Sequence, residues 1–381
     1  MRRPRLALAP AILLAMVGGS VGCNAILGNG YGVDVNAAND PDGSNGGGDA
    51  LVDGGGGGDG STGVDATVLD EASLLDRNDP DGSGCLNGVC PTMLASVVGP
   101  QRLALNATGV YWASAAGIGR VVYDGSNTKT FPIAQAVGSG LKRGIAVDAT
   151  SVYVTMPGGG KGAAKCAADL TSCAAGFIGS AGIASSIAVD ATHVYVGIFD
   201  DGTGSGLGGM WQTSLTGTAL LSYANGQVVR DIQVVGTTTY FRTSTAVNAV
   251  TAGGGPAVPA ANLASGEAPL GFVVAGATLV VATTNNHLQA CPIAPAPCAA
   301  TVVQSRPAAP SVLTADATHA YWLEGNGGTV NRCDLPGCTN AVTLADGQAS
   351  PSDIVVDGTS VYWANFGNAV GGGGAVMKLP K

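Results

Sequence analysis

Short apolar runs alternate with polar turns along residues 85–381, and the pattern repeats about every forty residues. In each repeat an aliphatic run leads into the phrase Asp-Ala-Thr, and a second apolar run containing Val-Tyr follows it. Two β-prone runs separated by such a turn predict a β-hairpin. The clearest copies end at Tyr153, Tyr195, Tyr321 and Tyr362, and the variant copies end at Tyr111, Tyr240 and Val280.

Seven copies at this spacing predict an all-β chain folded as a seven-bladed β-propeller. The copies are separated by 42, 42, 45, 40, 41 and 41 residues, the period of four-stranded propeller blades. After each hairpin, a glycine-rich loop leads to a third strand such as 328–332 and a fourth such as 341–344. The last repeat stops after its third strand, 374–379. We therefore expect residues 92–96 to supply its fourth strand and close the ring.

The repeated aspartate of the phrase allows two interpretations, a turn residue in every blade or a ring of catalytic acids. We favour the turn, because aspartate accepts hydrogen bonds from backbone amides two residues on, and few enzymes need several equivalent carboxylates. His193 and His319 share one repeat position and are interpreted as turn residues too. His287 has no acidic partner and no serine motif near it in the sequence. The four aspartates are Asp148, Asp190, Asp316 and Asp357.

Eight cysteines fall into four local pairs, which we expect to be disulfides: Cys85/Cys90, Cys166/Cys173, Cys291/Cys298 and Cys333/Cys338. Adjacent pairing is the simplest of the connectivities open to eight cysteines. Each pair lies at the turn between a third and a fourth strand. Zinc is the alternative, but the spacings are wider than in zinc sites, no histidine accompanies them, and export favours oxidation. We therefore expect no metal and no other cofactor.

The N-terminus predicts export and a lipid anchor. A basic region at 2–5 precedes an apolar stretch at 6–17 that is too short to span a bilayer, so residues 1–22 are interpreted as a signal peptide. The segment 20–23, Ser-Val-Gly-Cys, resembles a bacterial lipobox, which implies lipidation of Cys23. Its serine stands where leucine is usual, and simple secretion is the alternative. Because Asn24 follows the cysteine, we expect an outer-membrane lipoprotein in the periplasm or at the cell surface.

Residues 23–84 predict a disordered tether. Positions 24–84 hold twelve acidic side chains and one basic one, and apolar residues are too few for a core. The two Asp-Pro-Asp-Gly-Ser stretches, 40–44 and 79–83, lack the first ligand of a calcium loop and predict turns. The domain at 85–381 holds 13 basic and 14 acidic residues. This near neutrality argues against nucleic-acid binding and against any membrane contact besides the lipid anchor.

Three Tyr-Trp pairs, at 111–112, 321–322 and 362–363, resemble the YWTD repeats of low-density-lipoprotein-receptor propellers. The chain is also similar to bacterial extracytoplasmic propeller lipoproteins of the TolB-like and NHL-like kind. The resemblance covers 85–381. It departs from YWTD propellers in having seven units where they have six, and in lacking the final aspartate. It implies a binding scaffold with ligand contacts on one face, and it implies no particular activity.

Ligand contacts are expected among loop residues that do not repeat. Loops that enter the first strands and loops that join second and third strands share one face of a propeller, and loops carry function more often than the scaffold does. Their polar residues are Arg102, Arg143, Arg230, Asp231 and Asp353 in the first set, and Asp200, Asp201, Arg242, Glu324 and Asn365 in the second. For each of them, a solvated loop position is the alternative.

Three functions remain open. The first is a monomeric, non-enzymatic scaffold that binds a protein, peptide or glycan. The alternative is a hydrolase or lyase that uses carboxylates and arginines around the channel mouth, and the third is a spacer without a ligand. The sequence contains no Walker loop, no Gly-x-Ser-x-Gly and no His-Glu-x-x-His motif. An Asp and Arg paired in a deep pocket would favour the enzyme, and a flat polar face would count against it.

Overall fold

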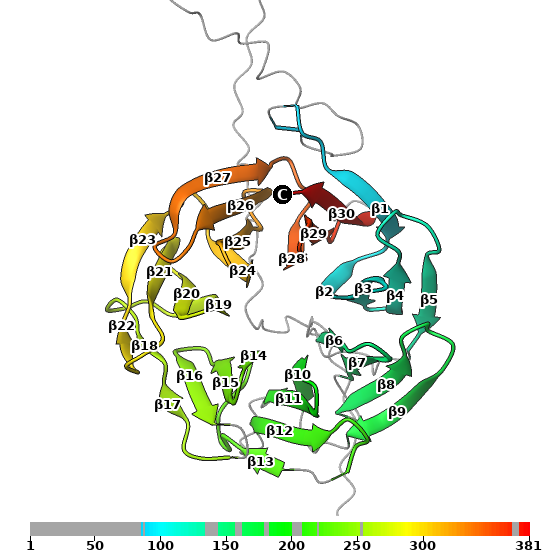
Figure 1. Cartoon of the computed structure of the whole chain (residues 1–381), viewed down its shortest axis with the longest axis horizontal. Helices are drawn as coiled ribbons and strands as arrows, with labels where there is room; N and C mark the ends of the chain where they lie inside the picture. The colour runs from blue at the N-terminus through cyan, green and yellow to red at the C-terminus, as the bar shows by residue number, and fades with distance from the viewer. Residues whose placement is uncertain are drawn as a thin grey trace, which may run out of the picture. The chain divides into compact units, whose positions relative to one another are not determined.

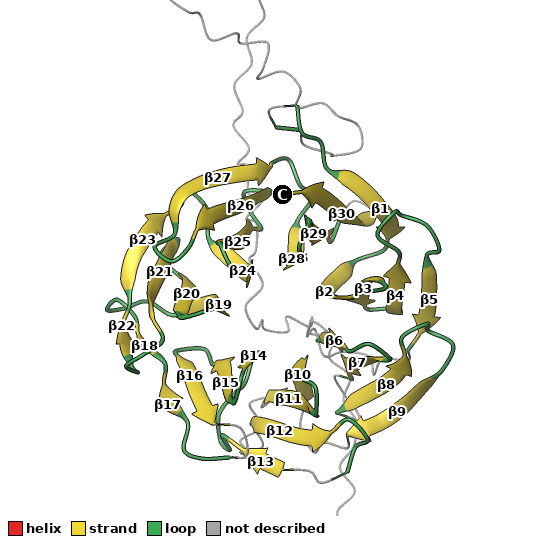
Figure 2. Ribbon diagram, in the orientation of Figure 1, coloured by secondary structure: helices red, strands yellow, loops and turns green. Residues whose placement is uncertain are grey.

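Seven four-stranded antiparallel sheets stand around a central channel in the computed structural model (Figure 1). Figure 2 shows strands and loops in the described part of the chain, which is all-β. The seven-bladed β-propeller predicted from the repeat is confirmed. The structure describes residues 85–86, 88–133, 144–156, 162–178, 183–199, 208–218, 221–251, 254–367 and 373–381.

The first strand of each blade lies next to the channel, and the fourth lies at the outside of the ring (Figure 1). Blades 1 to 3 comprise β2 (Pro100–Asn106), β3 (Gly109–Ser114), β4 (Gly117–Val121) and β5 (Lys129–Pro132); β6 (Ile145–Val147), β7 (Ser151–Thr155), β8 (Ala163–Ala167) and β9 (Cys173–Ile178); and β10 (Ile183–Val189), β11 (His193–Phe199), β12 (Gly209–Ser214) and β13 (Leu221–Tyr223).

Blades 4 to 6 repeat the same meander. They comprise β14 (Asp231–Val235), β15 (Thr238–Arg242), β16 (Val247–Thr251) and β17 (Val258–Pro259); β19 (Pro269–Ala275), β20 (Thr278–Thr283), β21 (His287–Pro292) and β23 (Thr301–Ser305); and β24 (Pro310–Ala315), β25 (His319–Glu324), β26 (Thr329–Asp334) and β27 (Thr339–Ala345). A short parallel pair, β18 (Ala261–Asn262) and β22 (Cys298–Ala299), joins the outer parts of blades 4 and 5.

Blade 7 closes the ring with strands from both ends of the described chain. It comprises β28 (Pro351–Val356), β29 (Ser360–Asn365), β30 (Gly374–Pro380) and, outermost, β1 (Thr92–Val97). β1 pairs antiparallel with β30, from Thr92 opposite Lys378 to Val97 opposite Gly374. This pairing confirms the closure predicted for residues 92–96. It also covers an edge of β30 that would otherwise expose unpaired backbone groups.

Neighbouring residues of a second strand pack against different blades, because side chains alternate across a strand. Tyr111 belongs to the apolar cluster between blades 1 and 2, whereas Trp112 belongs to the cluster between blades 7 and 1. The pair Tyr321 and Trp322 divides in the same way. Across the described residues, one such cluster fills each of the seven interfaces between blades. The Tyr-Trp pairs are thus part of the packing of the ring.

The four predicted disulfides are present. Three of them join a third strand to the segment that follows it, and the fourth precedes β1 at the equivalent turn of blade 7. They are Cys166–Cys173, Cys291–Cys298, Cys333–Cys338 and Cys85–Cys90.

Candidate functional site

A cavity of about 330 Å³ lies in the channel and is lined by residues at or near the first strands of all seven blades. The charged lining residues lie at or near the starts of first strands or at the end of a second strand. The cavity therefore lies towards the face that carries the loops entering the first strands and the loops joining second and third strands, here called the loop face. The opposite face carries the Asp-Ala-Thr turns and is called the turn face. The lining combines aliphatic side chains with serines and charged groups.

Four charged side chains from three blades meet at this cavity, and we call them the mouth cluster: Arg102, Asp231, Arg242 and Asp353. Arg102 of blade 1 donates from Nη2 to Oδ1 of Asp231 in blade 4 at 2.9 Å. It donates from Nη1 to Oδ1 of Asp353 in blade 7 at 3.3 Å. Arg242 donates from Nε to Oδ2 of Asp231 at 2.6 Å and from Nη1 to the Pro269 carbonyl at 3.1 Å. Two cations therefore match two anions.

A β-bulge places two members of the mouth cluster. The pairing of β2 with β3 shifts between Pro100 and Arg102, and the pairing of β28 with β29 shifts between Pro351 and Asp353. A bulge bends the strand and re-aims a side chain, and here Arg102 and Asp353 line the cavity. The Leu103 amide also donates to Oδ2 of Asp353 at 2.5 Å. The bulged starts of blades 1 and 7 are thereby joined.

The electrostatics of Arg102 follow from its neighbours. Burial by itself lowers the pKa of the guanidinium, but the carboxylates of Asp231 and Asp353 outweigh burial and raise the pKa above its ordinary value. Arg102 is therefore a permanent cation that reaches across the channel. The side chain of Asp353 is only 8% exposed. Removing the Arg102 cation would therefore leave a poorly solvated carboxylate with less compensation for its charge, which is costly.

The structure brings four of the ten predicted binding residues into the mouth cluster and places three others outside it. Arg230 immediately precedes β14, next to the cluster in the sequence. Glu324 and Asn365 are buried at the ends of β25 and β29. The remaining predicted residues, Arg143, Asp200 and Asp201, lie outside the described residues, as do Cys23 and the rest of 1–84.

Glu324 and Asn365 belong to a recurring contact, which we call the loop latch. It joins the loop entering a blade to the second or third strand of that blade. In blade 6, Arg306 Nε donates to Oε1 of Glu324 at 2.5 Å. In blade 7, Asn365 donates to Oε1 of Gln348 at 2.9 Å. Because the contact recurs, it favours a structural role for both residues. The other latches pair Gln227 with Asn248 and Glu267 with Gln289.

Blade 5 adds a histidine to its latch. Oε1 of Glu267 lies 2.9 Å from Nδ1 of His287, and Glu267 also accepts hydrogen bonds from Thr283 and Gln289. Burial raises the pKa of the Glu267 carboxyl, but these hydrogen bonds outweigh it and lower the pKa. The sequence offers no acidic partner near His287 because Glu267 stands 20 residues earlier. Aligning the loops that enter each first strand would have pointed to it.

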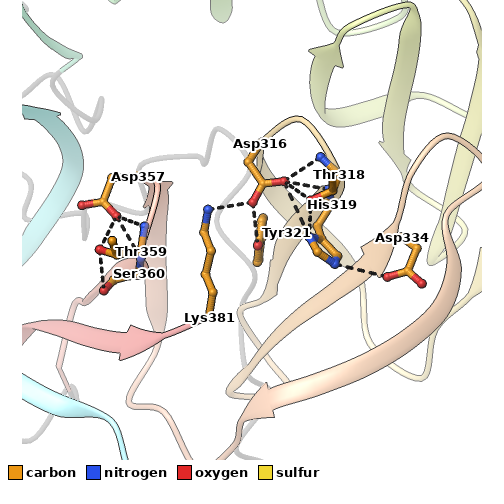
Figure 3. Close-up of polar contacts among 9 residues, drawn as sticks. All are labelled: Asp316, Thr318, His319, Tyr321, Asp334, Asp357, Thr359, Ser360 and Lys381. Carbon is orange, nitrogen blue, oxygen red and sulfur yellow. Dashed lines mark hydrogen bonds and ion pairs between the residues drawn. The ribbon is translucent and has the colours of Figure 1, made fainter.

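The repeated aspartates lie on the turn face and confirm the turn interpretation. In Figure 3, Oδ1 of Asp316 accepts hydrogen bonds from the amide and hydroxyl of Thr318 and from the His319 amide. Its Oδ2 accepts a hydrogen bond from the Tyr321 hydroxyl at 2.9 Å and forms an ion pair with Nζ of Lys381 at 2.7 Å. Equivalent turn and tyrosine bonds surround Asp148, Asp190 and Asp357. These carboxylates are engaged in building the hairpins.

The described residues contain neither a metal-binding cluster nor a membrane-spanning helix. Within those ranges, no group of three or more His, Cys, Asp and Glu side chains is arranged to hold a metal ion. The same ranges contain no helix with the length and apolar character needed to cross a membrane.

Comparison with known proteins shows the fold. No protein-family model matches this sequence, and no curated protein matches it. Among solved structures, virginiamycin B lyase from Staphylococcus aureus is 14% identical with a TM-score of 0.59, over 76% of this chain and 97% of that one. YCF48 bound to D1 peptide is 8% identical with a TM-score of 0.58, over 78% and 97%. The Neurospora crassa Pan2 WD40 domain is 12% identical with a TM-score of 0.56, over 75% and 90%.

These neighbours have β-propeller folds, and at such low identities the likeness shows the fold alone. It carries no information on lipid anchoring or on membership of a YWTD, TolB-like or NHL-like family. The activity of the lyase and the peptide bound to YCF48 belong to those proteins.

Proposed function

We propose that this chain is a non-enzymatic, monomeric binding scaffold of the cell envelope, held by a lipid on Cys23 and a tether at 23–84. Its loop face binds a protein, peptide or glycan at the channel mouth. The mouth cluster carries the proposal. Its charged residues belong to blades 1, 4 and 7 and do not recur in the other blades. A concave site with a few convergent polar groups is the usual form of a ligand pocket.

The state of the polar groups supports binding over catalysis. The two arginines and two aspartates of the mouth cluster neutralise one another. Two of the three serine hydroxyls of the lining are also engaged, since Ser185 donates to the Val229 carbonyl at 2.6 Å and Ser311 to the Leu323 carbonyl at 3.3 Å. The hydroxyl of Ser186 is enclosed and has no partner among the described residues. A nucleophile needs an adjacent base. Among the described residues that line the cavity there is no histidine, cysteine or lysine.

A hydrolase or lyase acting at the mouth is the second candidate. The observation that favours it is the pairing of Arg102 and Asp231 within hydrogen-bond distance at a cavity, the arrangement expected of such an enzyme. Virginiamycin B lyase shows that a propeller can host a lyase. The two candidates differ in the fate of the ligand. A recovered ligand is incubated with the full chain, and its mass is then measured by mass spectrometry. The mass stays unchanged if the protein is a scaffold and changes if the protein is an enzyme.

The scaffold is tested by affinity capture from the native envelope. Tagged full chain is compared with the Arg143→Ala/Arg230→Ala double variant, which removes two arginines expected near the starts of first strands. We expect the parent to recover a defined set of partners and the double variant to lose them. The matched control is Arg332→Ala, since Arg332 lies in the third strand of blade 6, outside the loops. If the parent and the double variant recover the same partners, or if neither recovers any, the assignment of binding to the loop face is wrong.

A further inference from the structure

Arg230 is a partly buried guanidinium that, within the described part of the chain, lacks the carboxylate partners of Arg102 and Arg242. Its Nε is enclosed and has no hydrogen-bond partner among the described residues. Its Cζ lies 5.4 Å from the centroid of the Phe199 ring, a cation–π distance. The backbone amide of Arg230 donates to the Arg242 carbonyl at 2.8 Å, which fixes the residue beside the mouth cluster. An enclosed donor without a partner in a native structure calls for an explanation.

The charges around Arg230 do not balance. Arg242 is occupied by Asp231 and by the Pro269 carbonyl, and Arg102 is occupied by Asp231 and Asp353. Among the described residues, Arg230 forms no ion pair, so the described charged side chains here carry one positive charge beyond their carboxylates. Burial and, after it, the nearby Arg242 cation outweigh the Asp231 carboxylate and lower the pKa of Arg230. Both causes disfavour an unaccompanied guanidinium, and a bound anion would relieve both.

We propose that Arg230, held on the face of Phe199, is a subsite for a carboxylate of a peptide ligand bound at the channel mouth. The proposal rests on the binding function above and names the group that the site recognises. A guanidinium offers parallel donors in a plane that matches the two oxygens of a carboxylate. One excess cation suits one anionic group, and the near neutrality of residues 85–381 does not suit a polyanion.

The lining of the adjacent cavity favours a peptide over a glycan. Ile232 and Phe272 lie in it together with Asp231 and Arg242, which flank Arg230 in sequence and in strand pairing. An aliphatic side chain next to a carboxylate can enter such a lining, and its burial adds to the affinity. A sugar presents hydroxyl groups that would need hydrogen-bond partners there.

The proposal is tested by calorimetry on the full chain with three mixtures of N-acetylated pentapeptides rich in Leu, Ile and Val. One mixture ends in a free carboxylate, the second ends in an amide and contains one glutamate, and the third ends in an amide and is neutral. We expect at least one acidic mixture to bind and the neutral mixture to bind at least tenfold more weakly. Binding of the first mixture would show that the site takes a C-terminal carboxylate, and binding of the second would show that it takes a glutamate side chain.

Two arginine variants isolate the subsite. Arg230→Ala should lower the affinity for the acidic mixture about tenfold or more. Arg230→Lys should retain part of that affinity, because lysine keeps the charge but lacks the planar guanidinium. Arg120→Ala is the matched control. Arg120 also lies over an aromatic ring, that of Tyr111, with an enclosed and unpartnered Nε, but its Nη2 donates to the Thr108 carbonyl. Thermal unfolding confirms that each variant is folded.

The outcomes separate this proposal from the binding function. Three outcomes would overturn the carboxylate subsite. They are no binding of any of the three mixtures, equal binding of the acidic and neutral mixtures, and equal affinity of Arg230→Ala and the parent for the acidic mixture. If envelope partners are nonetheless lost by the Arg143→Ala/Arg230→Ala variant, the scaffold stands without this subsite. If neither test responds to Arg230, both proposals fail.

Discussion

At the scale of the residue, one aspartate connects the turn of a hairpin to the core. Oδ1 of Asp148 accepts hydrogen bonds from the amides of Thr150 and Ser151, each at 2.7 Å, and Oδ2 accepts one from the Tyr153 hydroxyl at 2.9 Å. Burial and the bond to Asp148 raise the pKa of Tyr153 to about 12. The phenol therefore remains a donor at neutral pH. Its ring is buried in the cluster between blades 2 and 3.

These hydrogen bonds predict sensitivity to acid. Burial raises the pKa of the turn carboxyls, but hydrogen bonds from the turn and the tyrosine outweigh it and lower the pKa of Asp148, Asp190, Asp316 and Asp357. A carboxyl with a lowered folded pKa stabilises the fold above its unfolded pKa of about 3.9. It loses that contribution as the pH falls through the folded pKa. We expect the free energy of unfolding, measured in urea, to decline as the pH drops from about 5 towards 2.

A single substitution checks the source of this decline. Asp357→Asn keeps one acceptor oxygen in the turn but cannot titrate, and Asn106 fills the same position in blade 1, where it accepts the Thr108 amide at 2.8 Å. The variant should be less stable at pH 7 and should lose less stability on acidification. If its pH profile has the same slope as that of the parent, Asp357 does not contribute to the acid sensitivity.

At the scale of the element, blades 6 and 7 are held at both of their ends. The loop latch holds the incoming loop on the loop face, and the aspartate turn holds the first hairpin on the turn face. In three blades a disulfide also closes the turn between the third and fourth strands. These contacts lie at strand ends, where the sheet itself offers few hydrogen bonds. The apolar clusters between blades then hold the middle of each sheet.

Two disulfides of equal loop length separate the contribution of chain entropy from that of packing. Cys333–Cys338 and Cys85–Cys90 both span five positions, so each should contribute about 2 kcal/mol through the unfolded chain. Cys333 and Cys338 are also fully buried in the cluster between blades 5 and 6, whereas Cys90 is exposed. We expect Cys333→Ala/Cys338→Ala to lower the urea midpoint more than Cys85→Ala/Cys90→Ala. Equal losses would show that packing around the buried pair contributes nothing.

At the scale of the whole molecule, ring closure depends on one strand from the N-terminal side of the domain. β1 completes blade 7, and its Leu94 packs in the cluster between blades 7 and 1 with Trp112 and Tyr362. The mouth cluster also links blade 7 to blade 1, through Arg102 and Asp353. Lys378 of β30 adds a third connection at 2.9 Å to the Tyr123 carbonyl. The start and the end of the ring are thus joined at the core, at the channel and on the outside.

Adjacent residues of β1 provide a test of closure. Leu94 is 7% exposed and Met93 is 56% exposed. Leu94→Asp places a charge in the cluster between the first and last blades and should cost about 3 kcal/mol or more. Met93→Asp should change stability by less than about 0.5 kcal/mol. Thermal unfolding measures both, and similar melting temperatures for the two variants would show that β1 is not needed to hold the ring together.

The candidate site was predictable in part. Four residues, Arg102, Asp231, Arg242 and Asp353, could be chosen because they are polar and do not repeat. The sequence places them in loops, whereas the structure places them within strands, near the loop ends of those strands. Their mutual contacts could not be predicted, since Arg102 lies 129 positions from Asp231 and 251 from Asp353. Glu324 satisfies the same sequence criteria, yet it is buried in a latch. Whether a polar residue at a strand end turns to the channel or to its own blade depends on the bulge and on the loop packed against it.

The sequence by itself determined the blades, their number, the closing strand, the turn aspartates and the disulfides. These features depend on contacts between residues close in the chain, or on a pattern repeated so often that each copy supports the others. The tertiary structure alone decided which charges meet at the channel, that Glu267 pairs with His287, and that Arg230 is left beside the mouth cluster without an ion-pair partner among the described residues. Those contacts join distant positions and exist only once the ring is closed.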